Sequence, residues 1–349
     1  MNIEDLLKQK SEWLRGIGPD SDIVVSSRIR LARNLRGYPF THWGGDDEKA
    51  EIIEKIVTVC EKISRLKGAL FLRINEISKV DRQFLVERHL MSREFGAEPE
   101  HKMLIISSDE VMSVMVNEED HLRIQTMKSG FDLKNAWNII DAFDEALAKE
   151  LDFAYHDEFG YLTACPTNVG TGMRASVMLH LPSLVLTKQI DKILQAIAKL
   201  SLTTRGLYGE GTEASGNFFQ ISNQVTLGRS ESELIEHISG MIGQVIEHER
   251  NARNALLEKN EARLKDRVWR AFGILKSSRI ITSSETIDLL SSVRLGCDLN
   301  ILPGMNTELL NELFIITQPA HLQKLEGKKL TPEERDLKRA QIIRERLNI

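Results

Sequence analysis

Five arginines stand at the ends of apolar runs or beside glycines, where loops usually gather around a site. Arginine stays charged at ordinary pH, and its planar fork matches phosphate oxygens. Several arginines that converge would therefore form a phosphate clamp. Their spacing fits equally well a set of unrelated surface arginines, so spacing alone leaves both interpretations open. The five are Arg28, Arg30, Arg123, Arg174 and Arg205.

Three consecutive carboxylates follow the apolar run at 111–116: Glu118, Glu119 and Asp120. Alternation along an extended segment would aim Glu119 away from its two neighbours. One side would then order water on a magnesium ion, and the other would hold a substrate cation. An ordinary acidic loop, which is the commoner case, gives the same pattern.

The familiar nucleotide and hydrolase motifs are missing from the sequence. The segment GEGTEA at 209–214 matches a loose glycine-rich pattern, but no strand precedes it and no βαβ unit surrounds it. There is no Walker A sequence, no HRD or DFG set, no GxSxG and no HExxH. If the protein uses ATP, it does so by another architecture.

The elements that must position these residues change in character along the chain. Apolar periodicity of about 3.6 predicts helices early in the chain, and short apolar runs predict strands between them. After Ser230, which has capping-box spacing to Glu233, almost the whole chain has a helical pattern, and Thr331-Pro332 marks another helix start. This order predicts an α+β domain followed by an α-helical one. The expected helices are 3–15, 46–66, 81–94 and 132–151, the expected strands 23–25, 103–108, 111–116, 161–166 and 174–182, and 203–217 is expected to be a long mobile loop.

Bulk composition excludes several classes of protein. The net charge of -5 and the scattered basic residues argue against direct nucleic-acid binding. No stretch approaches the roughly 18 apolar residues of a membrane span. The 3 cysteines are odd in number and widely spaced, which fits neither a disulfide framework nor a zinc pair and favours a cytoplasmic location.

One segment is far more specific than these patterns. CPTNVGTGMRASVMLHLP (165–182) resembles the signature of the ATP:guanido phosphotransferases, the family of creatine and arginine kinases. Four further segments resemble family segments in the family's order, so the resemblance covers roughly residues 20–250. They are SSRIRLARN (26–34), ERHLMSREF (87–95), VNEEDHLRI (116–124) and RGLYGEGTEA (205–214). The resemblance implies an antiparallel sheet flanked by helices.

The resemblance also implies roles for individual residues. The five arginines would clamp the phosphates of ATP, and Glu118 and Asp120 would order water around Mg²⁺, with no site in which protein atoms alone hold the metal. Glu119 would hold the guanidinium and assist its deprotonation, with Glu210 as a second carboxylate and Cys165 beside them. The implied ATP-binding positions are Ser26, Ser27, Arg28, Ile29, Arg30, His89, Arg123, Arg174, Ala175, Ser176, Val177, Met178, Arg205, Gly206, Leu207, Tyr208, Gly209 and Glu210.

Two departures from creatine and arginine kinases narrow the substrate class. The SSR segment begins at residue 26, so the helical domain that closes over a small substrate in those enzymes has no counterpart before it, and Met178 stands where creatine kinases carry His. An open site would admit a side chain of a large protein. The missing domain, together with a helical segment added after the catalytic region, resembles the bacterial protein-arginine kinases, with residues 1–257 as the catalytic domain and 258–349 as the helical one.

In that group the helical domain supports dimerisation and binds phosphoarginine through an RDxxRA motif. The motif occurs here, and Arg335 and Arg339 would share one helix face, with Asp336 and Ala340 beside them. Two cations would take the phosphate and Asp336 the guanidinium. A solvated charged face of a terminal helix is the alternative.

The leading hypothesis is a protein-arginine kinase that uses Mg²⁺ and ATP to phosphorylate exposed arginines of proteins. The resemblance further implies a cytoplasmic homodimer, an activator protein, an AAA+ protease complex, and a role in stress response and protein quality control. The alternatives are a phosphagen-type kinase that acts on free arginine, and a non-catalytic adaptor that binds phosphoarginine.

Overall fold

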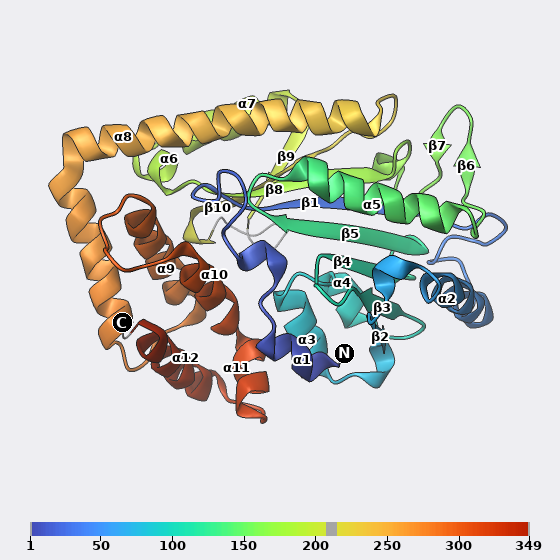
Figure 1. Ribbon diagram of the computed structural model, residues 1–349, viewed down its shortest axis with the longest axis horizontal. Helices are drawn as coiled ribbons and strands as arrows, with labels where there is room; N and C mark the ends of the chain where they lie inside the picture. Colours follow the sequence, from blue (N-terminus) through green and yellow to red (C-terminus); the bar gives the residue numbers. More distant parts are fainter. Residues whose placement is uncertain (1, 207–214, 348–349) are drawn as a thin grey trace.

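The computed structural model describes residues 2–206 and 215–347 and contains an eight-stranded sheet followed by a helical domain (Figure 1). The strand order is β2-β3-β4-β5-β1-β8-β10-β9, and every neighbouring pair is antiparallel. The predicted α+β class with an antiparallel sheet is therefore confirmed. The strands are β1 Val24–Arg33, β2 Leu70–Arg73, β3 Met103–Ile106, β4 Met112–Val116, β5 Leu122–Ser129, β8 Met173–His180, β9 Leu202–Arg205 and β10 Phe218–Asn223, with a separate hairpin of β6 Tyr155–His156 and β7 Gly160–Tyr161.

The two faces of the sheet differ because its central strands alternate polar and apolar residues. In β1, Ile29 and Leu31 are fully buried, whereas Arg28 and Arg30, which alternate with them, are only partly buried. The apolar face packs under helix α5 (Leu133–Ala148) and the first half of α8 (Glu231–Ser277) in the main hydrophobic core. Charged side chains, including Arg28 and Arg30, lie on the opposite face.

Two helix starts that capping signals predicted are present in the structure. Ser230 and Glu233 form the predicted capping box at the start of α8, and Thr331 accepts a hydrogen bond from the backbone N–H of Glu334 at the start of α12. The remaining helices are α1 Ile3–Lys8, α2 Asp46–Cys60, α3 Lys79–Glu87, α4 Arg93–Ala97, α6 Pro182–Leu186, α7 Ile190–Lys199, α9 Ser283–Asp298, α10 Thr307–Ile316, α11 Pro319–Glu326 and α12 Pro332–Leu347.

Several expected elements have different bounds. Strand β1 continues through Arg33 instead of ending at residue 25, because Arg28 and Arg30 occupy one face of a paired strand. The helix expected over 81–94 is split into α3 and α4 by a turn in which His89 has a φ of 59°. Residues 202–205 form strand β9, although they were expected to begin a loop.

Two further segments are less regular than expected. Residues 3–15 contain only α1 and a 3₁₀ turn at Glu12–Leu14, and the strand expected over 161–166 is reduced to β7, followed by a 3₁₀ turn at Pro166–Asn168. In both segments Ser or Pro interrupts the apolar pattern, which favours turns over continued pairing.

The helical domain packs on the sheet through a second hydrophobic cluster. Met127, Met178 and Phe218 of the sheet lie in this cluster with residues of α8, α9, α10 and α12. Helix α8 runs from one domain into the other and bends (Figure 1), with a non-helical backbone at Asn260. The expected division after residue 257 stays a prediction. Within the described part of the chain, no helix has the length and apolarity to cross a membrane.

Candidate active site

The register of the sheet brings the five predicted arginines to one face. Arg30 pairs directly with Arg174, and Arg28 lies two residues before Arg30 on the same side of β1. Gln125 pairs with Arg30, which places Arg123, two residues earlier, on that face as well. Paired residues in an antiparallel ladder point to the same side, so one surface carries guanidinium groups from three adjacent strands.

The fifth arginine joins the same face at the sheet edge. Arg205 of β9 pairs with Gln220 of β10, Gln220 pairs with Met178 of β8, and Met178 pairs with Ser26 of β1. Since Ser26 and Arg28 share a face, Arg205 shares it too. The register therefore places all five arginines on one face of the sheet, and their role as a phosphate clamp stays a prediction.

Positive charge is in excess on this arginine face. Burial, together with the neighbouring charges of Arg123, Arg174 and Arg205, lowers the pKa of Arg28 to about 10. Burial and the same kind of repulsion lower the pKa of Arg30 further, although Glu118 opposes them. Among the described residues, the buried Nε of Arg30 has no hydrogen-bond partner. A cluster of this kind is stabilised by a polyanion.

The acidic turn between β4 and β5 lies beside the arginines. Asn117 opens the turn with a φ of 61°, and its side-chain amide donates to the carbonyls of Lys49 and His101. Glu118 accepts from the Ser92 hydroxyl at 2.6 Å and forms an ion pair with Arg123. Burial alone would raise the pKa of Glu118, but Arg123 and Ser92 together lower it, so this carboxylate stays charged.

The other two carboxylates differ sharply from each other. Asp120 is buried, and its Oδ1 accepts from the Asn34 amide at 2.6 Å and from the backbone N–H of Ala164 at 2.7 Å. Glu119 is exposed. Although much of the residue is accessible to solvent, partial burial of its carboxyl group raises the pKa of Glu119, and the neighbouring Asp120 carboxylate raises it as well. An accessible carboxylate of raised pKa is suited to accepting a proton.

The segment that carries Cys165 lies beside this turn in space, because a backbone hydrogen bond joins the two. The hydrogen bond from Ala164 to Asp120 draws the segment that carries Cys165 toward the carboxylates, and the Cys165 Sγ is 3.0 Å from the Thr167 hydroxyl. Cys60, Cys165 and Cys297 are all free thiols. Within the described ranges, no group of three His, Cys, Asp or Glu side chains is arranged to hold a metal ion alone.

A mainly apolar cavity continues from the arginine face. Five of the predicted ATP-binding residues line it: Ser26, Arg28, His89, Ser176 and Met178. His89 stands edge-on to the Trp13 ring, with ring centroids 5.2 Å apart. Burial, and then Arg28, lowers the pKa of His89 to about 3, so the ring is neutral. The site thus consists of the arginine face and an adjoining, mainly apolar cavity.

Four of the predicted positions point the other way. The side chains of Ile29, Ala175 and Val177 are fully buried in the main core, and the Ser27 hydroxyl donates to the carbonyl of Gly130. These side chains lie on the opposite face of the sheet from the arginines and help to fix the strands that carry them. Gly206 is buried beside β9, and the positions predicted at Leu207, Tyr208, Gly209 and Glu210 lie outside the described residues.

The RDxxRA segment lies on α12, where its two arginines differ in exposure. Arg339 is buried, and its guanidinium donates to the carbonyls of Thr317 and Ile281 and pairs with Asp336. Arg335 is partly exposed, and Ala340 is fully buried. The pocket stays a prediction, and in this structure Arg339 holds neighbouring backbone segments together.

Sequence patterns did not reveal the residues that hold the site in shape. Asn34 binds both Asp120 and the backbone N–H of His121, and the Nδ1 of His121 accepts from the backbone N–H of Leu35. Ser92 fixes Glu118. Both Asn34 and Ser92 lie within segments that carry the family resemblance, and this position was the only available signal.

An arginine face beside a group of carboxylates suits phosphoryl transfer, since this reaction depends on positioning and charge neutralisation. Residues 51–252 match the family described as ATP:guanido phosphotransferase, C-terminal catalytic domain. Residues 261–349 match the protein-arginine kinase McsB C-terminal domain. The chain belongs to the ATP:guanido phosphotransferase family and, within it, to the protein-arginine kinases.

Relatives and solved structures agree with this assignment. The chain is 48% identical to the protein-arginine kinase of Halothermothrix orenii over 100% of both chains, and 49% identical to that of Moorella thermoacetica over 98% of both. The duplicated taurocyamine kinase of Schistosoma mansoni superimposes with a TM-score of 0.62 at 28% identity, over 72% of this chain and 36% of that one. This chain therefore spans only about a third of that structure. Lombricine kinase shares the fold, with a TM-score of 0.60 over 71% of this chain and 75% of that one.

Proposed function

We propose that the protein transfers the γ-phosphoryl group of ATP to arginine side chains of other proteins. The observation that carries this proposal is the arginine face beside the exposed Glu119. The named activity of full-length relatives at 48% and 49% identity supports it.

In the proposed reaction a guanidinium nitrogen attacks the γ-phosphorus, the bond to the β,γ-bridging oxygen breaks, and ADP leaves. The guanidinium must lose a proton, because its pKa lies above about 12 and its protonated form is a poor nucleophile. Glu119 accepts that proton, which its raised pKa favours. Glu210 and Cys165 would complete the guanidinium site.

The charge of the donor is taken up by the arginine face. Arg28, Arg30, Arg123, Arg174 and Arg205 would bind the phosphates of ATP. Glu118 and Asp120 suit water-mediated contacts to Mg²⁺, because both carboxylates are held by hydrogen bonds to protein groups. Mg²⁺ would neutralise phosphate charge when bound.

The test of this function is an assay of phosphoryl transfer with a matched control. The purified chain is incubated with Mg-ATP and a loosely folded arginine-rich protein or free L-arginine, and phosphate is located by mass spectrometry without acid treatment. We expect phosphoarginine on the protein, and a fall of about 10²- to 10⁴-fold in Glu119→Gln, the usual contribution of an acid–base group. Glu236→Gln, an exposed carboxylate on α8, should leave the rate unchanged.

The other outcomes of this assay separate the alternatives. Transfer only to free arginine would identify a phosphagen-type kinase. Binding of phosphoarginine without any transfer would favour a non-catalytic adaptor.

The assembly state is proposed from the surface of the helical domain. Trp269, Ile274 and Ile280 are 49%, 43% and 57% exposed along and just beyond the second half of α8, and exposed apolar patches commonly mark interfaces. We propose that residues 258–349 mediate a homodimer, which light scattering of Trp269→Glu would test. The phosphoarginine pocket at Arg335, Asp336, Arg339 and Ala340, an activator, an AAA+ protease partner, a cytoplasmic location and a role in stress response remain proposals that rest on the resemblance.

A further inference from the structure

The cavity beside the arginine face has walls from both domains. Its sheet side is formed by Ser26, Arg28 and Met178, and its opposite side by Phe314 and Ile315 of α10. The Trp13–Leu14 segment closes a third side. The helical domain therefore contributes side chains directly to a recess that opens from the proposed phosphate site.

Helix α10 is pressed against the sheet at this point. The ring of Phe314 meets the ring of Phe218 edge-on, with centroids 4.9 Å apart, and both side chains are nearly buried. The free space between the walls is about 40 Å³, room for roughly three water molecules. Met127 and Met178 also line it, and the flexible side chain of methionine can move aside for a flat ring.

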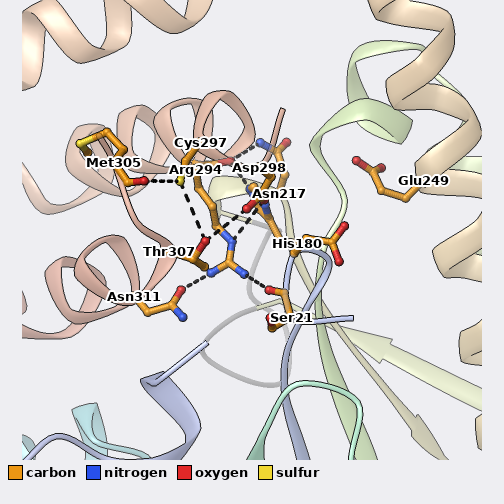
Figure 2. A network of polar contacts seen from close by, with 12 residues as sticks. Ser21, His180, Asn217, Glu249, Arg294, Cys297, Asp298, Met305, Thr307 and Asn311 are labelled. Carbon is orange, nitrogen blue, oxygen red and sulfur yellow. Dashed lines mark hydrogen bonds and ion pairs between the residues drawn. The ribbon is translucent and has the colours of Figure 1, made fainter. Parts of the chain in front are cut away.

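A polar network around Arg294 holds α10 (Figure 2), and Asn311 of that network also holds the Trp13–Leu14 segment. The buried Arg294 of α9 donates to the Asn311 side chain on α10 and, at 2.8 Å, to the carbonyl of Ser21. Asn311 in turn donates to the carbonyl of Leu14 at 3.0 Å. Asp298 lies 4.0 Å from the Arg294 guanidinium. The position of the cavity wall is thus set by groups inside the helical domain.

We propose that helix α10 is part of the nucleotide site, where Phe314 and Ile315 contact the base of ATP and Arg294 acts through Asn311 as a positioning residue. This inference rests on the proposed function. The cavity adjoins Arg28, so a nucleotide whose phosphates contact Arg28 can place its nucleoside in the cavity. A flat heteroaromatic base matches apolar walls that include aromatic rings.

The experiment compares a ligand with a base to one without. ADP and tripolyphosphate are titrated calorimetrically against the full chain, Phe314→Leu and Ile315→Val. Loss of the aromatic contact should weaken ADP binding about 3- to 10-fold, and loss of one methylene about 2- to 4-fold. Tripolyphosphate affinity should not change in either variant. Phe272→Leu, a half-buried phenylalanine on α8 outside the cavity, is the matched control and should behave as the wild type.

The readouts separate this inference from the proposed function. If the wild type binds ADP and both variants bind it equally well, α10 is not part of the site, although the kinase proposal stands. A role of α10 in binding the base is likewise excluded if ADP and tripolyphosphate weaken together. If the wild type binds neither ligand, both the kinase proposal and this inference fail. Ile315→Val decides the question should Phe314→Leu not fold, as its thermal unfolding midpoint would show.

Discussion

Two regions of this molecule hold buried arginines, and they use them in opposite ways. On the arginine face, the neighbours that shift the pKa of Arg28 are other arginines, which lower it. In the network around Arg294, burial lowers the pKa of Arg294, and the largest neighbouring influence, Asp298, opposes that lowering. The first region brings several arginines close together, and the second places carboxylates beside its arginines.

The two regions differ in how many carboxylates lie beside their buried arginines, and this difference separates a candidate binding site from a network that holds the fold together. Arg253 lies beside Arg294 and contacts three carboxylates, Glu249, Asp22 and Asp298, at 3.1, 3.2 and 3.6 Å. Folding therefore provides the counter-charges of these cations. On the arginine face, Glu118 pairs with Arg123, and we propose that a nucleotide polyphosphate supplies further counter-charge.

The largest effect on stability should come from breaking the balanced network. Arg294→Ala would remove one of the two cations beside the buried Asp298 and the donor to the Ser21 carbonyl and the Asn311 side chain, which should cost about 3–5 kcal/mol of unfolding free energy. Urea denaturation measures this loss. A change below about 1 kcal/mol would mean that the network does not brace the two domains.

Removing a cation from the arginine face should have a different consequence. Arg28→Ala relieves repulsion among arginines, so the fold should remain intact, but a charged contact to phosphate is lost. We expect kcat/KM for ATP to fall about 30- to 1000-fold, in line with about 2–4 kcal/mol for such contacts. Steady-state kinetics at constant ionic strength provides the test, and an unfolded variant would contradict the assignment.

The balanced network should also show in the pH dependence of stability. Burial, only partly opposed by Arg294, raises the pKa of Asp298 to about 6 from an ordinary value of 3.8. A carboxyl with a raised pKa binds its proton more tightly in the folded state, so its contribution to stability falls as pH rises from about 4 to 6. Between about pH 4 and 6, the unfolding free energy of the wild type should fall by about 1–3 kcal/mol relative to that of Asp298→Asn. Identical pH profiles of the two proteins would contradict this assignment of the pKa.

The smallest effect should come from an ion pair that belongs to neither region. Arg270 and Asp266 pair on exposed α8 with side chains that are 73% and 71% accessible. Arg270→Ala should change the unfolding free energy by at most about 0.5 kcal/mol and leave ATP kinetics unaltered. This variant provides the baseline for the two buried regions.

Sequence patterns identified several residues that the fold brings to one face, but they did not identify the residues that hold those side chains in position. Arg28, Arg30 and Arg174 were identified because they stand in specific segments, and strand register then placed them together. The contribution of Phe314 was not predictable, because it meets Phe218 only after the helical domain folds back onto the sheet. Arg339 was expected to face a ligand, yet it lies buried against the carbonyls of Thr317 and Ile281, since helical spacing does not reveal what packs against a face.

Boundaries were harder to predict than the existence of elements. The break at His89 depends on a left-handed backbone conformation that tertiary contacts impose, including the hydrogen bond from Gln125 to the His89 carbonyl. Strand β9 is short, and its pairing with β10 decides its conformation. The local sequence around His89 and around β9 does not predict either of these tertiary contacts.

The most direct test of the central claim is ATP-linked stability in the Arg30→Ala variant. The buried Nε of Arg30 lacks a partner among the described residues, so we assign it to the phosphates. Thermal unfolding is followed with and without saturating Mg-ATP. We predict that Arg30→Ala is at least as stable as the wild type without nucleotide and loses most of the stabilisation that nucleotide gives the wild type. A variant that is destabilised on its own, or that keeps the full nucleotide response, would show that the arginine face is a structural brace after all.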